Sequence, residues 1–299
     1  MKILLQVPEG LKSSVLRITR EFEKAGNEVL ISCEPCYGAC DLRDSEAKRL
    51  GCEKIIHYGH SKFVDSEIPV EYVEIKSEEK IILPNSELKN LEQFKKIGLV
   101  STLQFVDSLP QIKKQLEKTG KEVFIGKSDN KNLYAGQILG CNTGAAIVVE
   151  KKVDCFLYIG SGKFHPLGVA LASKKHVFVF DTEKNRIEKI ETEKFLKQKL
   201  ATIELARDAK TFGILVSTKP GQTNLKAAEE LKKRIEKSGR SAHILVMDEI
   251  KPDKVDYLGG ENSGIDAFIN TACPRIGIED RILFKKPILN LDETEEIIS

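Results

Sequence analysis

The sequence predicts an α/β protein of three similar small domains, each a parallel β-sheet with flanking helices, arranged around a central site. Three apolar segments begin alike, KILLQV at 2–7, KIGLVST at 96–102 and TFGILVST at 211–218. Each is followed by a charged amphipathic stretch, a glycine and a second apolar strand, which is the pattern of a βαβ unit. The same unit therefore occurs three times along the chain.

The elements of each unit are expected at corresponding places. Helices are predicted over 11–25, 107–119 and 225–238, each ending at a glycine suited to a helix C-cap (Gly26, Gly120 and Gly239), and second strands over 29–32, 123–126 and 242–247. Continuous apolar strands that alternate with helices indicate parallel sheets covered on both faces. We expect domains over 1–95, 96–206 and 207–299.

Composition narrows the class of protein. The 47 Lys and Arg nearly balance the 45 Asp and Glu, so direct binding of nucleic acid is not expected. The N-terminus reads directly into a strand rather than a signal peptide, and no apolar run approaches the roughly 18 residues of a membrane span. These features predict a cytoplasmic protein without membrane contact. Seven cysteines in a reducing compartment favour metal or redox roles over disulfides.

Corresponding residues of the first two units are separated by a constant distance of about a hundred residues along the sequence. This offset also matches a cysteine of the first unit with one of the second. The same shift carries Cys40 onto Cys141, and the segment Gly59-x-x-Lys62-Phe63 onto Gly160-x-x-Lys163-Phe164. Cys40 and Cys141 should therefore occupy equivalent places after the second strand of their units. Cys273 differs, because it follows the expected third strand of its unit, 265–272.

Cys40, Cys141 and Cys273 are the candidate cluster ligands. Each sits after a strand or at a helix start, one per unit, among small residues. Three thiolates on a [4Fe-4S] cube leave one iron open, whereas a fully ligated cluster only carries electrons. An open iron binds the amino and carboxylate groups of S-adenosylmethionine and passes one electron into its sulfonium. The triad thus predicts both cofactors.

The other four cysteines offer alternatives. Cys33 and Cys36 form a C-x2-C-x3-C motif with Cys40, which a local cluster would use. The simpler interpretation makes Cys33 a small buried residue at a strand end and leaves the role of Cys36 open. Cys52 and Cys155 precede apolar strands and are expected to pack in cores. His57 and His176 lie in strand contexts typical of core histidines.

Loops at the carboxyl ends of parallel strands are the usual ligand sites of such sheets. The cofactor-binding candidates in these loops are Gly59, His60, Ser61, Gly160, Ser161, Gly162, His165, Gln222 and Arg275. Glycine lets a ligand approach backbone N–H groups, although it equally permits a tight turn. Arg275 suits a carboxylate, or else an ion pair with a nearby acidic residue. Gln6 and Gln222 are candidates to hydrogen-bond the cofactor or the substrate. Gln222 could equally cap the helix that follows it.

Several strings together resemble one family. They are PEGLK at 8–12, PCYGACD at 35–41, HYGHSKF at 57–63, LGCN at 139–142, GSGKFHPLG at 160–168, STKPGQ at 217–222 and ACPRIGIED at 272–280. The chain resembles, over its whole length, the archaeal diphthamide-synthesis radical enzymes, which are 3-amino-3-carboxypropyl transferases acting on translation elongation factor 2.

The resemblance implies a homodimer of three-domain subunits in which the matching cysteines hold a [4Fe-4S] cluster, supplied by an electron donor. In this family the Cγ–S bond of S-adenosylmethionine is cleaved, and the 3-amino-3-carboxypropyl radical adds to C2 of one histidine of the elongation factor. Two alternatives share the architecture or the cluster: a quinolinate synthase-like [4Fe-4S] dehydratase and a non-catalytic iron-sulfur protein. The YGACD, STKPGQ and ACPRIGIED strings favour the transferase.

Overall fold

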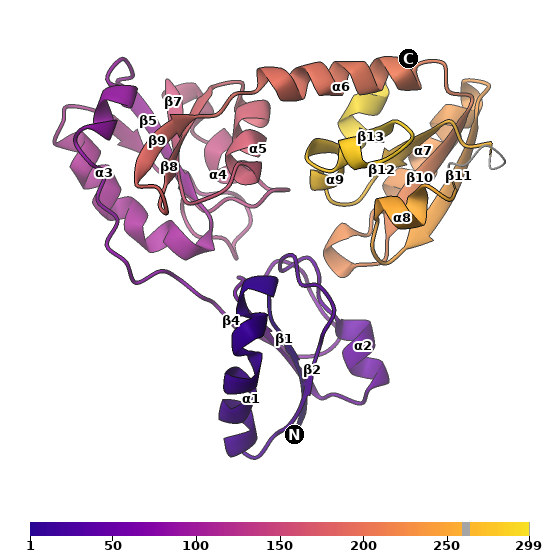
Figure 1. The fold of residues 1–299 in the computed structure, drawn as a ribbon, viewed down its shortest axis with the longest axis horizontal. Coiled ribbons are helices and arrows are strands. Elements are labelled where there is room, and N and C mark those ends of the chain that lie inside the picture. The colour runs from indigo at the N-terminus through magenta and orange to yellow at the C-terminus, as the bar shows by residue number, and fades with distance from the viewer. Residues whose placement is uncertain (259–263, 299) are drawn as a thin grey trace. The chain divides into compact units, whose positions relative to one another are not determined.

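The computed structural model describes residues 1–258 and 264–298. Within these residues the chain divides into two compact units, Met1–Glu191 and Thr192–Ser299. Three sheets occur in the described part, one within each of the three predicted segments (Figure 1). The predicted α/β class with parallel sheets and flanking helices is confirmed. The domain limits and the arrangement around a central site stay predictions.

The first sheet has four parallel strands in the order β2-β1-β3-β4. Its elements are β1 (Lys2–Gln6), α1 (Val15–Lys24), β2 (Glu28–Ile31), α2 (Asp44–Arg49), β3 (Lys54–Tyr58) and β4 (Val70–Val73). The expected helix over 11–25 is divided, because Glu9–Ser14 form a 3₁₀ helix before α1. Ile3 and Leu5 pack on one face of the sheet and Leu4 on the other.

The second sheet has five strands in the order β6-β5-β7-β8-β9, of which only β9 is antiparallel to its neighbour. Its elements are β5 (Lys96–Ser101), α3 (Leu109–Glu117), β6 (Glu122–Phe124), α4 (Gly144–Ile147), β7 (Cys155–Ile159), α5 (Phe164–Ser173), β8 (His176–Asp181) and β9 (Arg186–Lys189). Two buried clusters cover its faces. Leu157 packs with α3, while Phe156 and Tyr158 pack with α4 and α5, as alternation along a strand requires.

The outer edge of this sheet is covered locally. The backbone N–H of Ile187 in β9 donates to the Glu87 carboxylate (2.7 Å), and the Asn90 amide donates to the carbonyl oxygen of Ile187 (3.2 Å). Glu87 and Asn90 belong to the 3₁₀ helix Glu87–Leu91. Side chains of a helix therefore satisfy the backbone groups of the edge strand.

The second unit contains the third sheet, whose four parallel strands run in the order β11-β10-β12-β13. Its elements are α6 (Glu193–Ala206), β10 (Thr211–Ser217), α7 (Leu225–Lys237), β11 (Ser241–Met247), α8 (Pro252–Val255), β12 (Ala267–Asn270), α9 (Arg275–Ile278) and β13 (Ile288–Asn290). Residues of α6 and α7 share one buried cluster with alternate residues of β10. Phe268 and Leu215 belong to the cluster on the opposite face.

The expected helix ends are confirmed by backbone geometry. Gly26, Gly120 and Gly239 follow α1, α3 and α7 with φ of +82°, +82° and +80°, the left-handed conformation that ends helices. In the described part of the chain, no helix combines the length and the apolar character that crossing a membrane requires.

Candidate functional site

Cys40 and Cys141 occupy corresponding loops, as the constant offset predicts. Cys40 lies between β2 and α2 and is half-buried, and Cys141 lies between β6 and α4 and is exposed. A tight turn places Cys141 at its tip, since Leu139 and Asn142 exchange two backbone hydrogen bonds of 2.8 and 3.1 Å. Both thiols therefore stand beyond the carboxyl ends of parallel strands.

Cys273 lies in the second unit, between β12 and α9, and is half-buried. Asn270 shapes this turn. Its amide donates to the carbonyl oxygen of Cys273 (2.9 Å), and its side-chain oxygen accepts the N–H of Ala272 (3.0 Å). As expected from sequence, this thiol follows the third strand of its sheet rather than the second.

The donor set fits an iron-sulfur cluster chemically. Each sheet offers one thiol from a loop at its carboxyl edge, and none of the three is fully buried. Thiolates are the protein ligands of such clusters. Cys40 and Cys141 belong to one unit and Cys273 to the other. Their convergence on one centre stays a prediction.

The remaining four cysteines differ in solvent exposure. Cys52 and Cys155 are buried, at 7% and 0% exposure, which confirms their packing role. The expectation that Cys33 is buried is wrong, because β2 already ends at Ile31 and Cys33 falls in the exposed turn that follows. Cys36 is buried at 2% exposure.

The loop after β3 contains the first group of cofactor candidates. Gly59 has φ of +86°, and a Cβ there would lie 3.0 Å from the Pro8 ring, so this turn requires glycine. His60 is half-buried and contacts His57 through a 2.9 Å hydrogen bond. Ser61 is buried, and its hydroxyl accepts from the Gln137 amide at 3.3 Å. Since Gln137 pairs with Ser101 at the end of β5, this bond joins the carboxyl edges of the first two sheets.

A chain of hydrogen bonds begins at Gln6 and fixes the state of both histidines. The Gln6 amide donates to the carbonyl oxygen of Asp41, so its side-chain oxygen faces Nδ1 of His57 (3.2 Å). That oxygen only accepts, so Nδ1 of His57 carries the hydrogen and Nε2 accepts from Nδ1 of His60. Burial lowers the pKa of His57 to about 3 and that of His60 to about 4. Both rings are therefore neutral at physiological pH.

The loop after β7 contains the second group. Gly160 and Gly162 have φ of +146° and +79°, while Ser161 between them is exposed. His165 lies in the first turn of α5, with its ring parallel to that of Tyr158 (centroids 6.3 Å apart). Burial raises the pKa of Tyr158 to about 12, which keeps this phenol protonated. The loop is thus exposed at Ser161 and Gly162, beside a stacked imidazole.

Gln222 and Arg275 lie in the second unit. Gln222 ends a 3₁₀ turn at Pro220–Gln222, and the N-cap position of α7 is occupied by Asn224 rather than by Gln222. Arg275 forms a 2.6 Å ion pair with Glu279 one turn further along α9. The ion-pair interpretation of Arg275 is thus realised, and a role in binding a carboxylate stays a prediction.

Sequence analysis did not identify two further features of the site. Gln137 was not singled out, although it hydrogen-bonds to Ser61. His57 was expected to be a core histidine only, and it is fully buried, yet it also adjoins His60 and Cys36. The two histidines in HYGHS were a usable signal, whereas the approach of Cys36 depends on the fold. His176, also expected in a core, is exposed at the start of β8.

Comparison with known proteins decides the family. A family model described as diphthamide synthesis protein matches residues 7–299. The chain belongs to this family. The 2-(3-amino-3-carboxypropyl)histidine synthase of Pyrococcus horikoshii is 35% identical, over 99% of this chain and 85% of its own length. That of Methanocaldococcus jannaschii is 32% identical, over 98% and 83%.

Comparison with solved structures supports the same family assignment. The crystal structure of Dph2 from Pyrococcus horikoshii with a 4Fe-4S cluster superimposes with a TM-score of 0.90 at 35% identity, covering 99% of this chain and 86% of that one. The chain is therefore an enzyme of the 2-(3-amino-3-carboxypropyl)histidine synthase class, and the quinolinate synthase and non-catalytic alternatives are set aside.

Proposed function

We propose that this enzyme holds a [4Fe-4S] cluster through Cys40, Cys141 and Cys273 and transfers the 3-amino-3-carboxypropyl group of S-adenosylmethionine to C2 of a histidine of translation elongation factor 2. The observation that carries the proposal is the placement of one incompletely buried thiol at the carboxyl edge of each sheet. The presence of a 4Fe-4S cluster in the solved relative supports it.

The cluster, when bound, offers an open iron and one electron for cleavage of the Cγ–S bond. The overall reaction breaks that bond, forms a bond from Cγ to the imidazole C2, releases the C2 proton and leaves 5′-methylthioadenosine. An electron donor primes the cluster, and the remaining partners are the elongation factor and, in a homodimer, a second copy of this chain. We place this activity in the cytoplasm.

The loops after β3 and β7 would hold the S-adenosylmethionine. Gly59, Gly160 and Gly162 have positive φ and shape these turns, but the N–H groups of Gly59 and Gly160 already donate to the carbonyl oxygens of Val73 and Phe180. The exposed Gly162 would offer its backbone to a carboxylate or a ribose. His60 and Ser61 are held by Nε2 of His57 and by Gln137, so their positions are set before a ligand arrives. His165, Ser161, Gln222 and Arg275 complete the proposed binding set.

The first experiment measures the product. The enzyme is incubated anaerobically with dithionite, S-adenosylmethionine and the elongation factor. The mass of the peptide that contains the target histidine is then measured by mass spectrometry. We expect the mass gain of one 3-amino-3-carboxypropyl group and an equal amount of 5′-methylthioadenosine. Formation of 5′-deoxyadenosine instead, or an unmodified peptide with a fully loaded cluster, contradicts the proposed reaction.

A second experiment identifies the ligands. The anaerobically reconstituted enzyme should contain about four irons per chain. Cys40→Ala, Cys141→Ala and Cys273→Ala should each lose the cluster and its electron paramagnetic resonance signal. Cys33→Ala is the matched control, because Cys33 is an exposed thiol in the same loop as Cys40, and it should retain both. Retention in Cys141→Ala and Cys273→Ala with loss in Cys33→Ala would support the local motif instead.

A further inference from the structure

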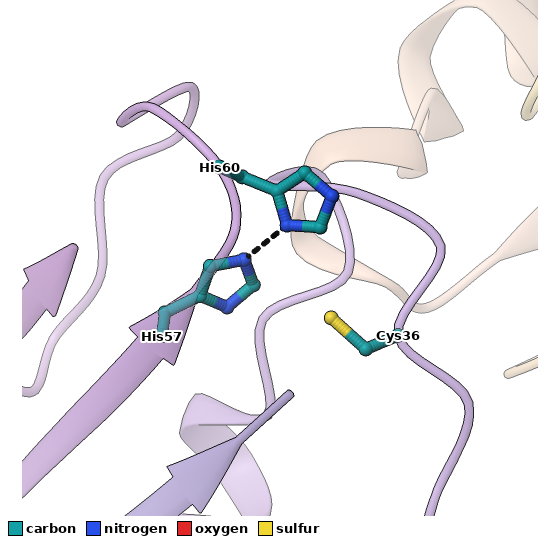
Figure 2. A group of neighbouring side chains, drawn as sticks. All are labelled: Cys36, His57 and His60. Carbon is teal, nitrogen blue, oxygen red and sulfur yellow. Dashed lines mark hydrogen bonds between the residues drawn. The ribbon is translucent and has the colours of Figure 1, made fainter. Parts of the chain in front are cut away.

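Cys36, His57 and His60 form a compact group outside the cluster cysteines. The sulfur of Cys36 and one nitrogen of each imidazole all lie within 4.8 Å of one another. Figure 2 shows the two rings, from the end of β3 and the loop after it, and the Cys36 sulfur directed toward them from a separate loop. Cys36 and His57 are 2% and 0% exposed. The group is thus built into the fold rather than gathered on the surface.

The hydrogen bonds around the group orient its donor atoms. Gln6 accepts from Nδ1–H of His57, which leaves the lone pair of Nε2 facing His60. A metal-bound histidine typically donates its other N–H to such an acceptor, which fixes both tautomer and ring orientation. Gln6 is itself held by the carbonyl oxygen of Asp41, and the ring of Tyr72 packs against His57 with centroids 5.5 Å apart.

The distances suit a small tetrahedral ion. With zinc bonds of about 2.0–2.3 Å, tetrahedral ligand atoms lie about 3.4–3.7 Å apart. Nε2 of His57 and Nδ1 of His60 are now 2.9 Å apart around a shared proton, so they need to separate by about half an ångström. The proton on Nδ1 of His60 moves to its Nε2, which keeps the ring neutral and leaves that N–H for the S-adenosylmethionine role proposed above. The Cys36 thiol releases its proton to solvent.

We propose that Cys36, His57 and His60 bind one zinc ion. One thiolate and two imidazoles form a mixed sulfur and nitrogen set that suits this borderline-soft cation, with a fourth position for water or another ligand. The ion would fasten the loop between β2 and α2 to the end of β3. Because Cys40 lies in that loop, the metal would position a cysteine of the proposed cluster site without binding it.

The test uses the full chain with Cys40, Cys141 and Cys273 replaced by serine, so that no cluster forms. Co²⁺ is titrated anaerobically as a coloured substitute for zinc. We expect one Co²⁺ per chain, the strong visible bands of a tetrahedral site, a thiolate charge-transfer band, and displacement of Co²⁺ by Zn²⁺. The result is independent of the transferase reaction, since this variant has no cluster and activity is not measured.

Further variants in the same background assign the ligands. Cys36→Ser should abolish the charge-transfer band, and His57→Gln should abolish tetrahedral binding. Gln6→Ala should weaken zinc affinity by about 10–100-fold, the usual effect of removing the acceptor behind a metal-bound histidine. Cys33→Ser is the matched control for an exposed thiol of the same loop and should bind as the parent does. Circular dichroism confirms that each variant is folded.

A measurement on the unaltered sequence guards against variants that misfold. Zinc added to the full chain with its cluster loaded, so that Cys40, Cys141 and Cys273 are occupied, should give an X-ray absorption spectrum that fits one sulfur and two imidazole nitrogens. The proposal is overturned by the absence of stoichiometric Co²⁺ binding in the folded parent variant. It is equally overturned by undiminished binding in both Cys36→Ser and His57→Gln.

Discussion

The seven cysteines show how strongly position sets the behaviour of one residue type. Burial raises the pKa of the Cys155 thiol from 9.0 to about 12, whereas Cys33 is exposed in a turn. A thiol is reactive only as the thiolate, so the two should differ widely in chemical reactivity. Cys155 belongs to the buried cluster around α3 and has a purely structural role.

The raised pKa of Cys155 predicts a pH dependence of stability. Between pH 9 and about 12 the unfolded chain loses this proton while the folded chain retains it. The contribution of Cys155 is therefore complete below pH 9 and falls as pH rises, by about 1.4 kcal/mol per unit. Urea unfolding of the parent and Cys155→Val between pH 8 and 10.5 measures the difference. Cys33→Val should leave the slope unchanged, and parallel curves for Cys155→Val would refute the assignment.

At the residue scale, the sequence predicted the thiols but not all of their surroundings. Cys273 was a candidate because it closely follows β12, at the carboxyl edge of its sheet. Cys141 lies in the long loop between β6 and α4 and was a candidate because of its constant offset from Cys40. Cys33 was wrongly predicted to be buried because β2 was expected to extend to it. The strand ends two residues earlier, at Ile31, so Cys33 lies in the loop that follows. The approach of Cys36 to His57 was not predictable, since it joins residues of two separate loops.

At the element scale, the last 3₁₀ helix, Leu291–Glu296, is fastened by a buried ion pair. Arg281 donates to the Glu293 carboxylate at 2.6 Å, and both side chains are 2% exposed. The other carboxylate oxygen of Glu293 accepts the N–H of Asn290 (2.9 Å), which starts the helix as a capping box. Arg281 also donates to the carbonyl oxygen of Gly277. One guanidinium thus links α9 to the C-terminal segment.

Removal of one partner of this pair should be costly. Arg281→Met removes the guanidinium from the buried Glu293 carboxylate and leaves only the Lys199 ammonium, 3.8 Å away, as a cation. Breaking a buried pair in this way costs about 3–5 kcal/mol of the free energy of unfolding. Arg234→Met is the matched control, because Arg234 binds Glu295 of the same helix at the exposed surface, where ion pairs contribute little. Denaturant unfolding measures both variants. Equal losses would contradict the role assigned to burial.

Helix limits were predicted unevenly, and the reason lies in local packing. The expected helix over 225–238 matches α7 closely, because Ala228, Leu231 and Ile235 repeat at helical spacing and all are buried. The first helix begins four residues later than expected, at Val15, since Glu9–Ser14 form a 3₁₀ turn with no buried residue. Amphipathic periodicity identifies a helix well only where the apolar face is continuous.

At the scale of the whole molecule, two of the sheets share a packing detail that marks their common plan. Gly98 in β5 is paired in register with Phe156 in β7, and Gly213 in β10 with Phe268 in β12. A Cβ would lie 2.4 Å from the Phe156 ring and 2.7 Å from that of Phe268. Each central strand thus leaves space for an aromatic ring of its neighbour. In the first sheet, Leu4 and Ile55 occupy the corresponding pair.

This shared detail predicts matching effects in two separate units. Gly98→Ala and Gly213→Ala should each lower the free energy of unfolding by about 1–3 kcal/mol, the usual cost of overpacking a core. Gly10→Ala is the control, because nothing lies within 4 Å of a Cβ at that position. Thermal and denaturant unfolding test all three variants. A neutral Gly98→Ala or Gly213→Ala would show that the ring moves aside freely.

The covered edge of the second sheet has a consequence for association between molecules. An unpaired edge strand offers its N–H and C=O groups to a strand of another chain, which is a route to aggregation. Here the carboxylate of Glu87 and the amide of Asn90 already occupy both groups of Ile187. The flanking Arg186, Glu188 and Lys189 add charge to β9. The 3₁₀ helix Glu87–Leu91 thus protects the folded enzyme against strand addition and so favours its solubility.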